Sequence, residues 1–445
     1  MELKLKVRHG ISSAMVLLGL LQLYQLFQWH LDDSSSLSLD EFHFDSIRRT
    51  TTRSAIGSWG PPAPGPSSPS RTSHTSSITT GSNTISHTAN KNIINKEEEG
   101  FSACLMIMDD NAHLIEWLAY HYQMLPLRRL IVAIDPRSET SPKDILQRWQ
   151  TTTPQHAGID ITTWSDVDFM PPHKMDAHKQ IPDWQTARIT DLHRERQEHF
   201  YARCMARLHY EGKGWTALMD TDEYILANAN AQRESSIIDR QHPERTILEL
   251  IHKAHKENEH FRKKLDESPC VPMARLRFGV LESTASETSS NVNIRVVPNK
   301  IPTGFSTNDF QTLRWRHHGG RGAKNINKIG KAMIDLSRVD SYLFLPTTQV
   351  MVHLPMKQYC NGNDLWMINA WSPFIMHHYG GTWEQWSHRK DSRGTRTREN
   401  YKKMAYDRGP DDNIRPWLNY FVQNVGYSAA KDLLRGVGQV ESNTA

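Results

Sequence analysis

The chain has little cysteine and no Cys-x-x-Cys pair. Its four cysteines, Cys104, Cys204, Cys270 and Cys360, are far apart, which argues against a zinc ribbon or a dithiol redox motif. In an oxidising compartment they would form up to two disulfides, in any of three pairings. Because Cys104 and Cys204 lie in apolar stretches typical of buried segments, free thiols are the alternative.

Three further features are absent. There is no internal repeat, and no basic stripe interleaved with aromatic residues accompanies the net charge of +4, so we expect no nucleic-acid partner. No Asn-x-Ser/Thr sequence occurs either. Because many lumenal proteins also lack this sequence, its absence is only a mild argument against a lumenal location.

Only one segment is apolar and long enough to cross a membrane. Residues 11–29 carry no charge and, at about 1.5 Å per residue, just span a bilayer core. Because Lys4, Lys6 and Arg8 precede them, we expect a cytosolic tail (1–10) and a signal-anchor helix (11–30). A cleaved signal peptide is the alternative. Residues 31–98, rich in Ser, Thr, Pro and Gly, predict a disordered stem.

Residues 99–427 are expected to form the folded domain and residues 428–445 a tail. From Ser102 to Met219 the sequence alternates between strand and helix patterns. Apolar runs predict strands at 102–107, 129–134, 159–164 and 215–219, and helical spacing predicts helices at 112–123, 144–149 and 196–210. This order is the signature of an α/β fold with a mostly parallel sheet flanked by helices. Such sheets bind ligands beyond the carboxyl ends of their strands.

The most informative motif is Asp220-Thr221-Asp222-Glu223, which follows the apolar run from Trp215 to Met219. Side chains alternate faces along a strand, so we expect Asp220 and Asp222 to project together from the strand end. Two adjacent carboxylates repel one another, and a divalent cation that also grips a diphosphate relieves the repulsion. On the same argument Glu223 would point away from Asp222. The plainer alternative is an acidic turn after a core strand.

Several blocks of the chain, taken in order, resemble the glycosyltransferase family 92-like proteins, a former domain-of-unknown-function family (number 23) that belongs with the GT-A nucleotide-sugar transferases. The similar segments run from Phe101 to about Met404. They are Phe101–Ile107 with Asp110, Asn111, Glu116, Trp117 and His121; Gln197, Tyr201 and Cys204; Trp215 with Met219–Ile225; Phe278-Gly279; Lys328–Ile334 with Val352-His353; and Met376–Tyr379 with Trp383, Glu384 and Lys390. Two segments, 170–191 and 228–268, look like insertions.

The resemblance implies a GT-A (Rossmann-like) fold and a metal site. It makes Asp222 a direct metal ligand and Asp220 a partner to the metal, to water or to a ribose. A His near the end of the domain often adds a ligand, with His378 the first choice and His353 the second. A lone His in apolar sequence is more often a hydrogen-bonded core residue, and that is the alternative for His353. Mn²⁺ suits mixed carboxylate and imidazole ligation.

The resemblance also implies where the nucleotide sugar binds. GT-A folds hold the nucleotide at the end of the first strand, here Asp110 and Asn111, and place a ribose- or base-contacting acid after the second, here Asp135. An N-cap role explains Asp110 or Asn111 without a ligand. A basic loop, in which Lys328 is the candidate diphosphate contact, surrounds Gly319 to Gly322; its cations are Arg314, Arg316, Lys324, Lys328 and Lys331. A solvated loop is the alternative reading.

The expected activity is transfer of a sugar from a nucleotide-sugar donor to a glycan, glycoprotein or glycolipid acceptor. The resemblance favours inversion, for which a carboxylate base is needed; the candidates are Glu282, Asp309 and Asp335. The expected setting is a single-pass type II protein of the Golgi or endoplasmic-reticulum membrane with a lumenal domain, with a homodimer as an open option. The alternatives are a metal-dependent phosphoester hydrolase and a catalytically inactive protein on the same fold.

Overall fold

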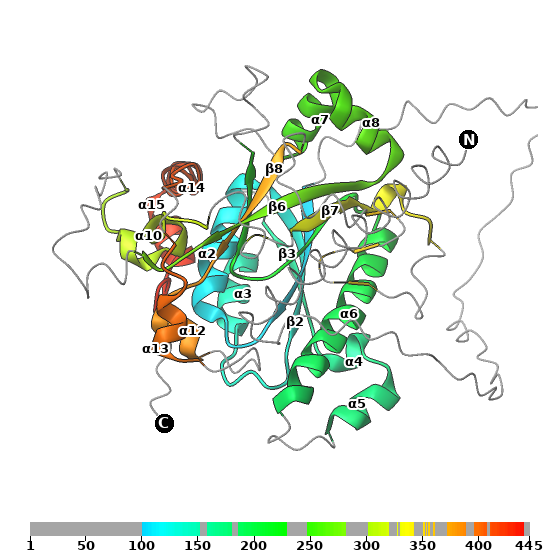
Figure 1. Cartoon of the computed structure of the whole chain (residues 1–445), viewed down its shortest axis with the longest axis horizontal. Helices are drawn as coiled ribbons and strands as arrows, with labels where there is room; N and C mark the ends of the chain where they lie inside the picture. Colours follow the sequence, from blue (N-terminus) through cyan, green and yellow to red (C-terminus); the bar gives the residue numbers. More distant parts are fainter. Residues whose placement is uncertain are drawn as a thin grey trace, which may run out of the picture. The chain divides into compact units, whose positions relative to one another are not determined.

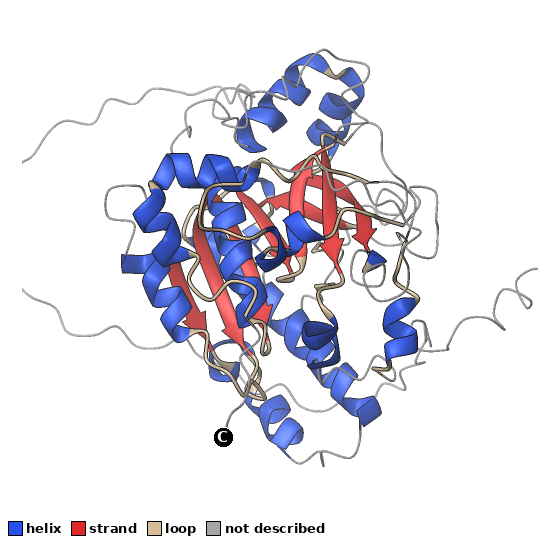
Figure 2. Cartoon of the chain, turned by 90° about the vertical axis from the view of Figure 1, so that its left-hand side faces the viewer, coloured by secondary structure: helices blue, strands red, loops and turns tan. Residues whose placement is uncertain are grey.

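A mixed eight-stranded sheet flanked by helices forms the centre of the folded part (Figures 1 and 2). The computed structural model describes residues 100–151, 158–179, 186–228, 247–281, 301–319, 330–341, 372–388, 396–406 and 410–439, together with Asn327, Val350, Met351, His353, Pro355, Met356, Tyr359 and Cys360. The expected anchor (11–30) and stem (31–98) lie outside these residues. No helix in the described part is long and apolar enough to cross a membrane.

The strand order of the sheet is β3-β2-β1-β4-β7-β6-β8-β5. Neighbours are parallel from β3 to β4 and between β6 and β8, and antiparallel at β4–β7, β7–β6 and β8–β5. The bounds are β1 (Phe101–Ile107), β2 (Leu127–Ile134), β3 (Asp160–Trp164), β4 (Trp215–Met219), β5 (Glu223–Ala227), β6 (Cys270–Phe278), β7 (Lys331–Asp335) and β8 (Phe374–Tyr379). The expected α/β sheet is therefore present, and four of its seven pairings are parallel.

Helices cover both faces of the parallel part. Their bounds are α2 (Asn111–Met124), α3 (Lys143–Thr151), α4 (Asp166–Phe169), α5 (Pro172–Lys179), α6 (Thr186–Tyr210), α7 (Ile247–Glu257), α8 (Glu259–Glu267), α10 (Gln311–Arg314), α12 (Trp383–His388), α13 (Arg398–Lys402), α14 (Trp417–Val425) and α15 (Tyr427–Leu433), with short 3-10 turns η1 (Thr307–Asp309) and η2 (Leu336–Arg338). In Figure 1, α2, α3, α14 and α15 lie on one side of the sheet and α6 on the other.

The sequence of β1 explains this layering, because every residue of the strand is buried and successive side chains face opposite layers. Phe101, Ala103 and Leu105 belong to the core formed with α2 and α14. Cys104 and Met106 belong to the core formed with α6. A continuous apolar strand therefore predicts the sandwich of helix, sheet and helix that is observed.

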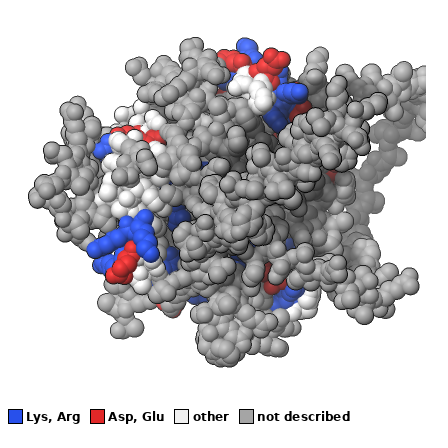
Figure 3. Space-filling view, in the orientation of Figure 1, with Lys and Arg blue, Asp and Glu red and all other residues white. Residues whose placement is uncertain are grey.

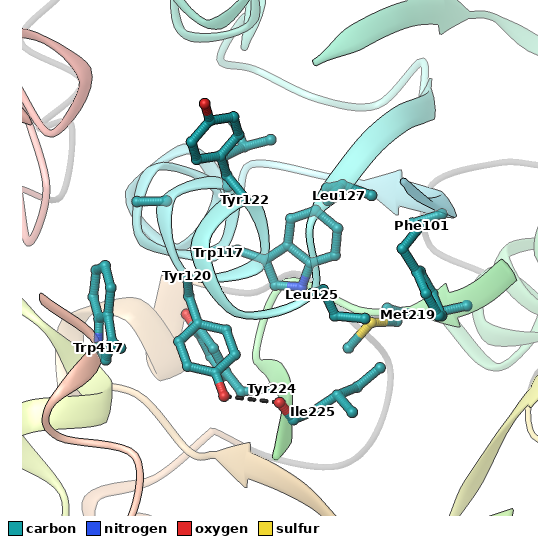
Figure 4. Close-up of a cluster of buried hydrophobic side chains, with 14 of the residues drawn as sticks. Phe101, Trp117, Tyr120, Tyr122, Leu125, Leu127, Met219, Tyr224, Ile225 and Trp417 are labelled. Atoms are coloured by element: carbon teal, nitrogen blue, oxygen red, sulfur yellow. Dashed lines mark hydrogen bonds between the residues drawn. The ribbon is translucent and has the colours of Figure 1, made fainter. Parts of the chain in front are cut away.

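The larger core is rich in aromatic residues. Tyr120 lies between Tyr224 and Trp417, at centroid distances of 5.1 and 5.8 Å with edge-to-face geometry. Its hydroxyl donates to the backbone oxygen of Ile225 at 2.7 Å (Figure 4). Since that oxygen belongs to the edge strand β5, this hydrogen bond ties α2 to the far edge of the sheet.

The sheet curls back on itself. In the strand order, β4 and β5 are four positions apart, which is about 19 Å in a flat sheet. Only residues 220–222 connect them, and the four steps from Met219 to Glu223 span at most about 14 Å. The connection is a tight turn, in which the amide of Glu223 donates to the oxygen of Asp220 at 3.2 Å. The curl thus brings β5 beside the carboxyl end of β4.

Several elements lie in segments for which no helix or strand was predicted from the sequence. The segment 228–268 contains the helical pair α7 and α8, on which acidic and basic side chains are intermixed (Figure 3). At the end of the chain α15 buries Ala430 and Leu433 in the larger core. The packed domain therefore runs past the boundary expected at residue 427, and the expected tail 428–445 is too long.

Both pairs of cysteines are joined as disulfides, and no described cysteine is free. Cys104 of β1 bonds Cys204 of α6, with Cα atoms 6.1 Å apart. Cys270 of β6 bonds Cys360, with Cα atoms 5.4 Å apart. Of the three pairings that the sequence left open, this one follows from the layering, because Cys104 faces α6.

Removing the Cys104–Cys204 disulfide is expected to destabilise the fold by about 2–4 kcal/mol, because the bond closes a loop of 100 residues in the unfolded chain. Urea unfolding of the Cys104→Ala, Cys204→Ala double variant against wild type measures the loss. An unchanged midpoint, in the presence and absence of reductant, would contradict this expectation.

Glu116 is a buried carboxylate in the middle of α2 that holds the start of α10. Its oxygens accept hydrogen bonds from the backbone amides of Gln311 and Thr312 at 2.8 and 3.0 Å, and from the Thr312 hydroxyl. Burial raises the pKa of Glu116 to about 7, although these hydrogen bonds oppose the rise. The side chain thus caps the N-terminus of α10, which is more than 190 residues away in the sequence.

Glu116 should make stability depend on pH. A folded-state pKa of about 7 against an ordinary 4.5 favours the folded state fully below 4.5, and this contribution is lost as pH rises through 7. From near pH 5 to near pH 8.5, wild type should therefore lose about 2–3 kcal/mol more unfolding free energy than Glu116→Gln. Urea titrations at the two pH values measure the difference, and equal losses in both proteins would refute it.

Candidate functional site

The acidic motif lies in a turn at one rim of the sheet, where the carboxyl ends of β1, β2 and β4 meet. The carboxyl ends of β6 and β8 and the first residues of β5 and β7 also reach this rim through the curl. Asp220 and Asp222 therefore do not sit on an extended strand as expected, and alternation of faces does not position them. The turn directs the two carboxylates to different partners.

Asp222 faces His378. The side chain of Asp222 is 6 % exposed, and its Oδ2 lies 3.4 Å from Nε2 of His378, whose own side chain is 18 % exposed. The backbone holds the pair, because the amide of Tyr379 donates to the oxygen of Asp222 at 2.9 Å. Burial lowers the pKa of His378 to about 4, although the charge of Asp222 opposes this shift. His378 is therefore neutral near pH 7, which is the form that binds a metal.

Asp220 faces Lys331 instead. Oδ2 of Asp220 lies 3.0 Å from Nζ of Lys331, and the side chain of Asp220 is 37 % exposed. Lys331, the first residue of β7, is fully buried. Burial alone would raise the pKa of Asp220, but the charge of Lys331 brings it below its ordinary value. Asp220 therefore stays ionised, with one oxygen committed to an internal cation.

Glu223 belongs to the same cluster, contrary to the expectation that it points away. Its Oε2 lies 2.6 Å from Nζ of Lys331 and accepts the backbone amide of Asp220 at 3.0 Å. Burial raises the pKa of Glu223, the charge of Lys331 opposes this rise, and the charges of Asp220 and Asp222 add to it. Two carboxyl groups, those of Asp220 and Glu223, thus contact a single buried lysine.

His353, the second choice for a metal ligand, lies near this cluster but not in a strand. Its Nδ1 is 3.0 Å from the backbone oxygen of Gly330. Burial lowers the pKa of His353 to about 3, and the charge of Lys331 contributes to the shift. A hydrogen bond to the backbone is the structural role that the sequence offered as the alternative for this residue.

Three residues expected to contact the nucleotide reach the same rim, and each of them contacts another residue of the protein. Asn111 is buried and donates to the backbone oxygen of Ser141 at 3.2 Å. Asp135 is buried and accepts a two-pronged contact from Arg137 at 2.9 and 2.6 Å. Burial would raise the pKa of Asp135, but the bonds from Arg137 hold it well below the usual range. Asp110, with a 20 % exposed side chain that makes no N-cap hydrogen bond to α2, is the more accessible of the three.

The candidate bases are dispersed. Asp335 lies opposite Trp215 at the start of β4, which puts it about 13 Å from the end of that strand. Its Oδ1 accepts from the amide and hydroxyl of Ser337. Asp309 is exposed in η1, against the backbone of Gly438. Glu282 lies outside the described residues.

The basic loop does not gather its cations at one place. Arg316 forms an ion pair with Asp412, and Arg314 lies 4.5 Å from the ring centroid of Trp315. Lys331 is buried in β7 rather than presented by the loop. The two other members, Lys324 and Lys328, lie outside the described residues, as does Lys390. Of the three members that the structure describes, Lys331 alone lies at the acidic turn.

Two basic residues of the rim were not singled out from the sequence. Arg275 and Arg277 lie two apart in β6, so they point to the same face. Arg277 is the register partner of His378 on β8, and His378 in turn pairs with Glu223. Basic residues at i and i+2 in an otherwise apolar strand are a signal for a polar face, and that signal was available in the sequence.

Asp222 and His378 are placed so that both could bind the same cation. Two ligands that each lie about 2.1 Å from one cation are about 3–3.5 Å apart, and the 3.4 Å between Asp222 and His378 falls in that range. Within the described ranges no three His, Cys, Asp or Glu side chains converge as a metal group. A cation would therefore take its other ligands from water, substrate or residues outside those ranges.

Comparison with known proteins does not identify a family for this chain. No family model matches it, and no curated protein does.

Proposed function

We propose that this protein is a metal-dependent glycosyltransferase with a GT-A fold, which transfers a sugar from a nucleotide-sugar donor to a glycan or glycoconjugate acceptor. The observation that carries the proposal is the pairing of Asp222 with the neutral His378 at the carboxyl rim of a curled α/β sheet. Open α/β sheets bind nucleotides at that rim.

Asp222 and His378 would be the protein's ligands for the cation, and their mixed chemistry suits Mn²⁺. A bound divalent cation stabilises the negative charge that develops on the leaving diphosphate. Asp220 has a different role in this proposal. With one oxygen on Lys331, it anchors the turn that aims Asp222, and its exposed side leaves it able to contact water or a ribose hydroxyl.

The acceptor must lose a proton during an inverting transfer, and that step needs an accessible carboxylate. Asp309 and Asp335 lie away from the Asp222–His378 pair, which argues against either residue as the base. Glu223 is also unsuited, because it is buried and paired with Lys331, with Oε2 2.6 Å from Nζ. Glu282 follows β6 within a few residues and is the candidate that we retain.

A lumenal location belongs to the same proposal. Two disulfides are typical of proteins that fold in an oxidising compartment. Together with the apolar segment 11–30 and the low-complexity segment 31–98, they support a type II protein of the Golgi or endoplasmic-reticulum membrane.

The direct test is a panel of nucleotide sugars offered to the purified protein with Mn²⁺ or with a chelator. We expect release of free nucleoside diphosphate from one donor, increased by an acceptor glycan and abolished by the chelator. Release of phosphate from simple esters without sugar transfer would favour a hydrolase. Lack of both activities over the whole panel would favour an inactive protein.

A further inference from the structure

Arg277 is a cation without an anionic partner among the described residues. Its side chain is partly buried, and its Nη2 lies 3.8 Å from Sδ of Met404. The buried Nε has no hydrogen-bond partner. A thioether sulfur is a weak acceptor, and a partly desolvated guanidinium without a good acceptor is costly. Most other buried cations among the described residues have a carboxylate partner, as Arg129 has Glu211 and Lys331 has two carboxylates.

Arg277 lies at the same rim of the sheet as the Asp222–His378 pair. It is the next-to-last residue of β6 and lies in register with His378, so both side chains project from the same face at the carboxyl rim. His378 thus has a carboxylate on one side, at 3.4 Å in Asp222, and a guanidinium on the neighbouring strand on the other. Arg275, two residues before Arg277, adds positive charge to the same face.

We propose that Arg277 binds phosphate oxygens, forming an anion subsite beside the Asp222–His378 pair, with Arg275 in support. A divalent cation held by a diphosphate would present its positive charge to Asp222 and leave negative phosphate oxygens for Arg277. The site has a carboxylate on one side of His378 and a guanidinium on the other, and it therefore matches such a ligand. The planar guanidinium donates two parallel hydrogen bonds to phosphate, which a lysine cannot reproduce. That the phosphates are those of a nucleotide-sugar donor rests on the proposed function; the phosphate subsite itself does not.

Inorganic pyrophosphate is the probe. Isothermal titration of the purified protein with pyrophosphate, with and without Mn²⁺, should show binding that Arg277→Met weakens by about 10- to 100-fold. Arg277→Lys should fall between the two proteins. Arg262→Met, on the exposed surface of α8, is the matched control and should bind as wild type does.

A second measurement on wild type guards against a misfolded variant. Phenylglyoxal modification of Arg277, mapped by mass spectrometry, should be slower in the presence of pyrophosphate. Equal affinity of Arg277→Met and wild type, absence of pyrophosphate binding by wild type, or no protection of Arg277 would each overturn the subsite. Arg277-dependent binding without transfer from any donor would retain the subsite and overturn the proposed function. Sugar transfer by the protein, combined with full pyrophosphate affinity in Arg277→Met, would retain the proposed function and overturn the subsite.

Discussion

Asp222→Asn is expected to lower sugar transfer about a thousandfold, or about 4 kcal/mol of transition-state stabilisation, while the protein stays folded. The substitution keeps the shape of the side chain and its contact with His378 but removes the charge that would bind the cation. Because Asp220 is held by Lys331, Asp220→Asn should cost less activity than Asp222→Asn. Initial rates with the donor found in the panel, together with thermal unfolding, measure both effects.

The control for this experiment is Asp160→Asn. Asp160 begins β3 at the opposite rim of the sheet, where it lies 3.4 Å from Nε of Arg129, and its side chain is 74 % exposed. The variant should transfer sugar as wild type does. Full activity of Asp222→Asn, or an equal loss in Asp160→Asn, would remove Asp222 from the reaction.

Lys331→Met is expected to destabilise the fold by about 3–5 kcal/mol, because it leaves the buried Glu223 and the neighbouring Asp220 without a cation. Most of the loss should come from Glu223, which is 1 % exposed, since solvent screens the more accessible Asp220. Adding Glu223→Gln to Lys331→Met should therefore recover part of the loss. Urea unfolding of the two single variants and the double variant gives the coupling energy.

An exposed lysine provides the comparison. Lys403 lies exposed just after α13, and its Nζ donates to Oδ1 of Asn400 at 3.1 Å. Lys403→Met should change stability by no more than about 0.5 kcal/mol. If Lys331→Met proved equally mild, the carboxyl groups of Asp220 and Glu223 would not depend on this lysine, and the description of the cluster would be wrong.

The parallel half of the sheet could be predicted from the sequence because local signals suffice there. Runs such as Phe101 to Ile107 are apolar throughout, as a strand buried on both faces must be. The helices between them show apolar residues at helical spacing. The predicted strands at 102–107, 129–134, 159–164 and 215–219 all match observed strands within about two residues.

The site was harder to predict, because contacts between distant residues form it. The orientation of Glu223 depends on the curl of the sheet, so the period of two along a strand gave the wrong face. The partners of Lys331 lie more than 100 residues away, and the sequence around Lys331 contains no pattern that predicts them. The pairing of Asp222 with His378 was foreseen only through the resemblance to a family, whereas the paired arginines of β6 could have been read from the sequence.

The most direct test of the metal site is a crystal structure of the protein grown with Mn²⁺ and the donor, with diffraction data collected at the manganese absorption edge. We expect an anomalous peak about 2.0–2.3 Å from both Oδ2 of Asp222 and Nε2 of His378, with the diphosphate of the donor beside it. A donor bound at another place, or a peak that is absent from this pair, would contradict the account.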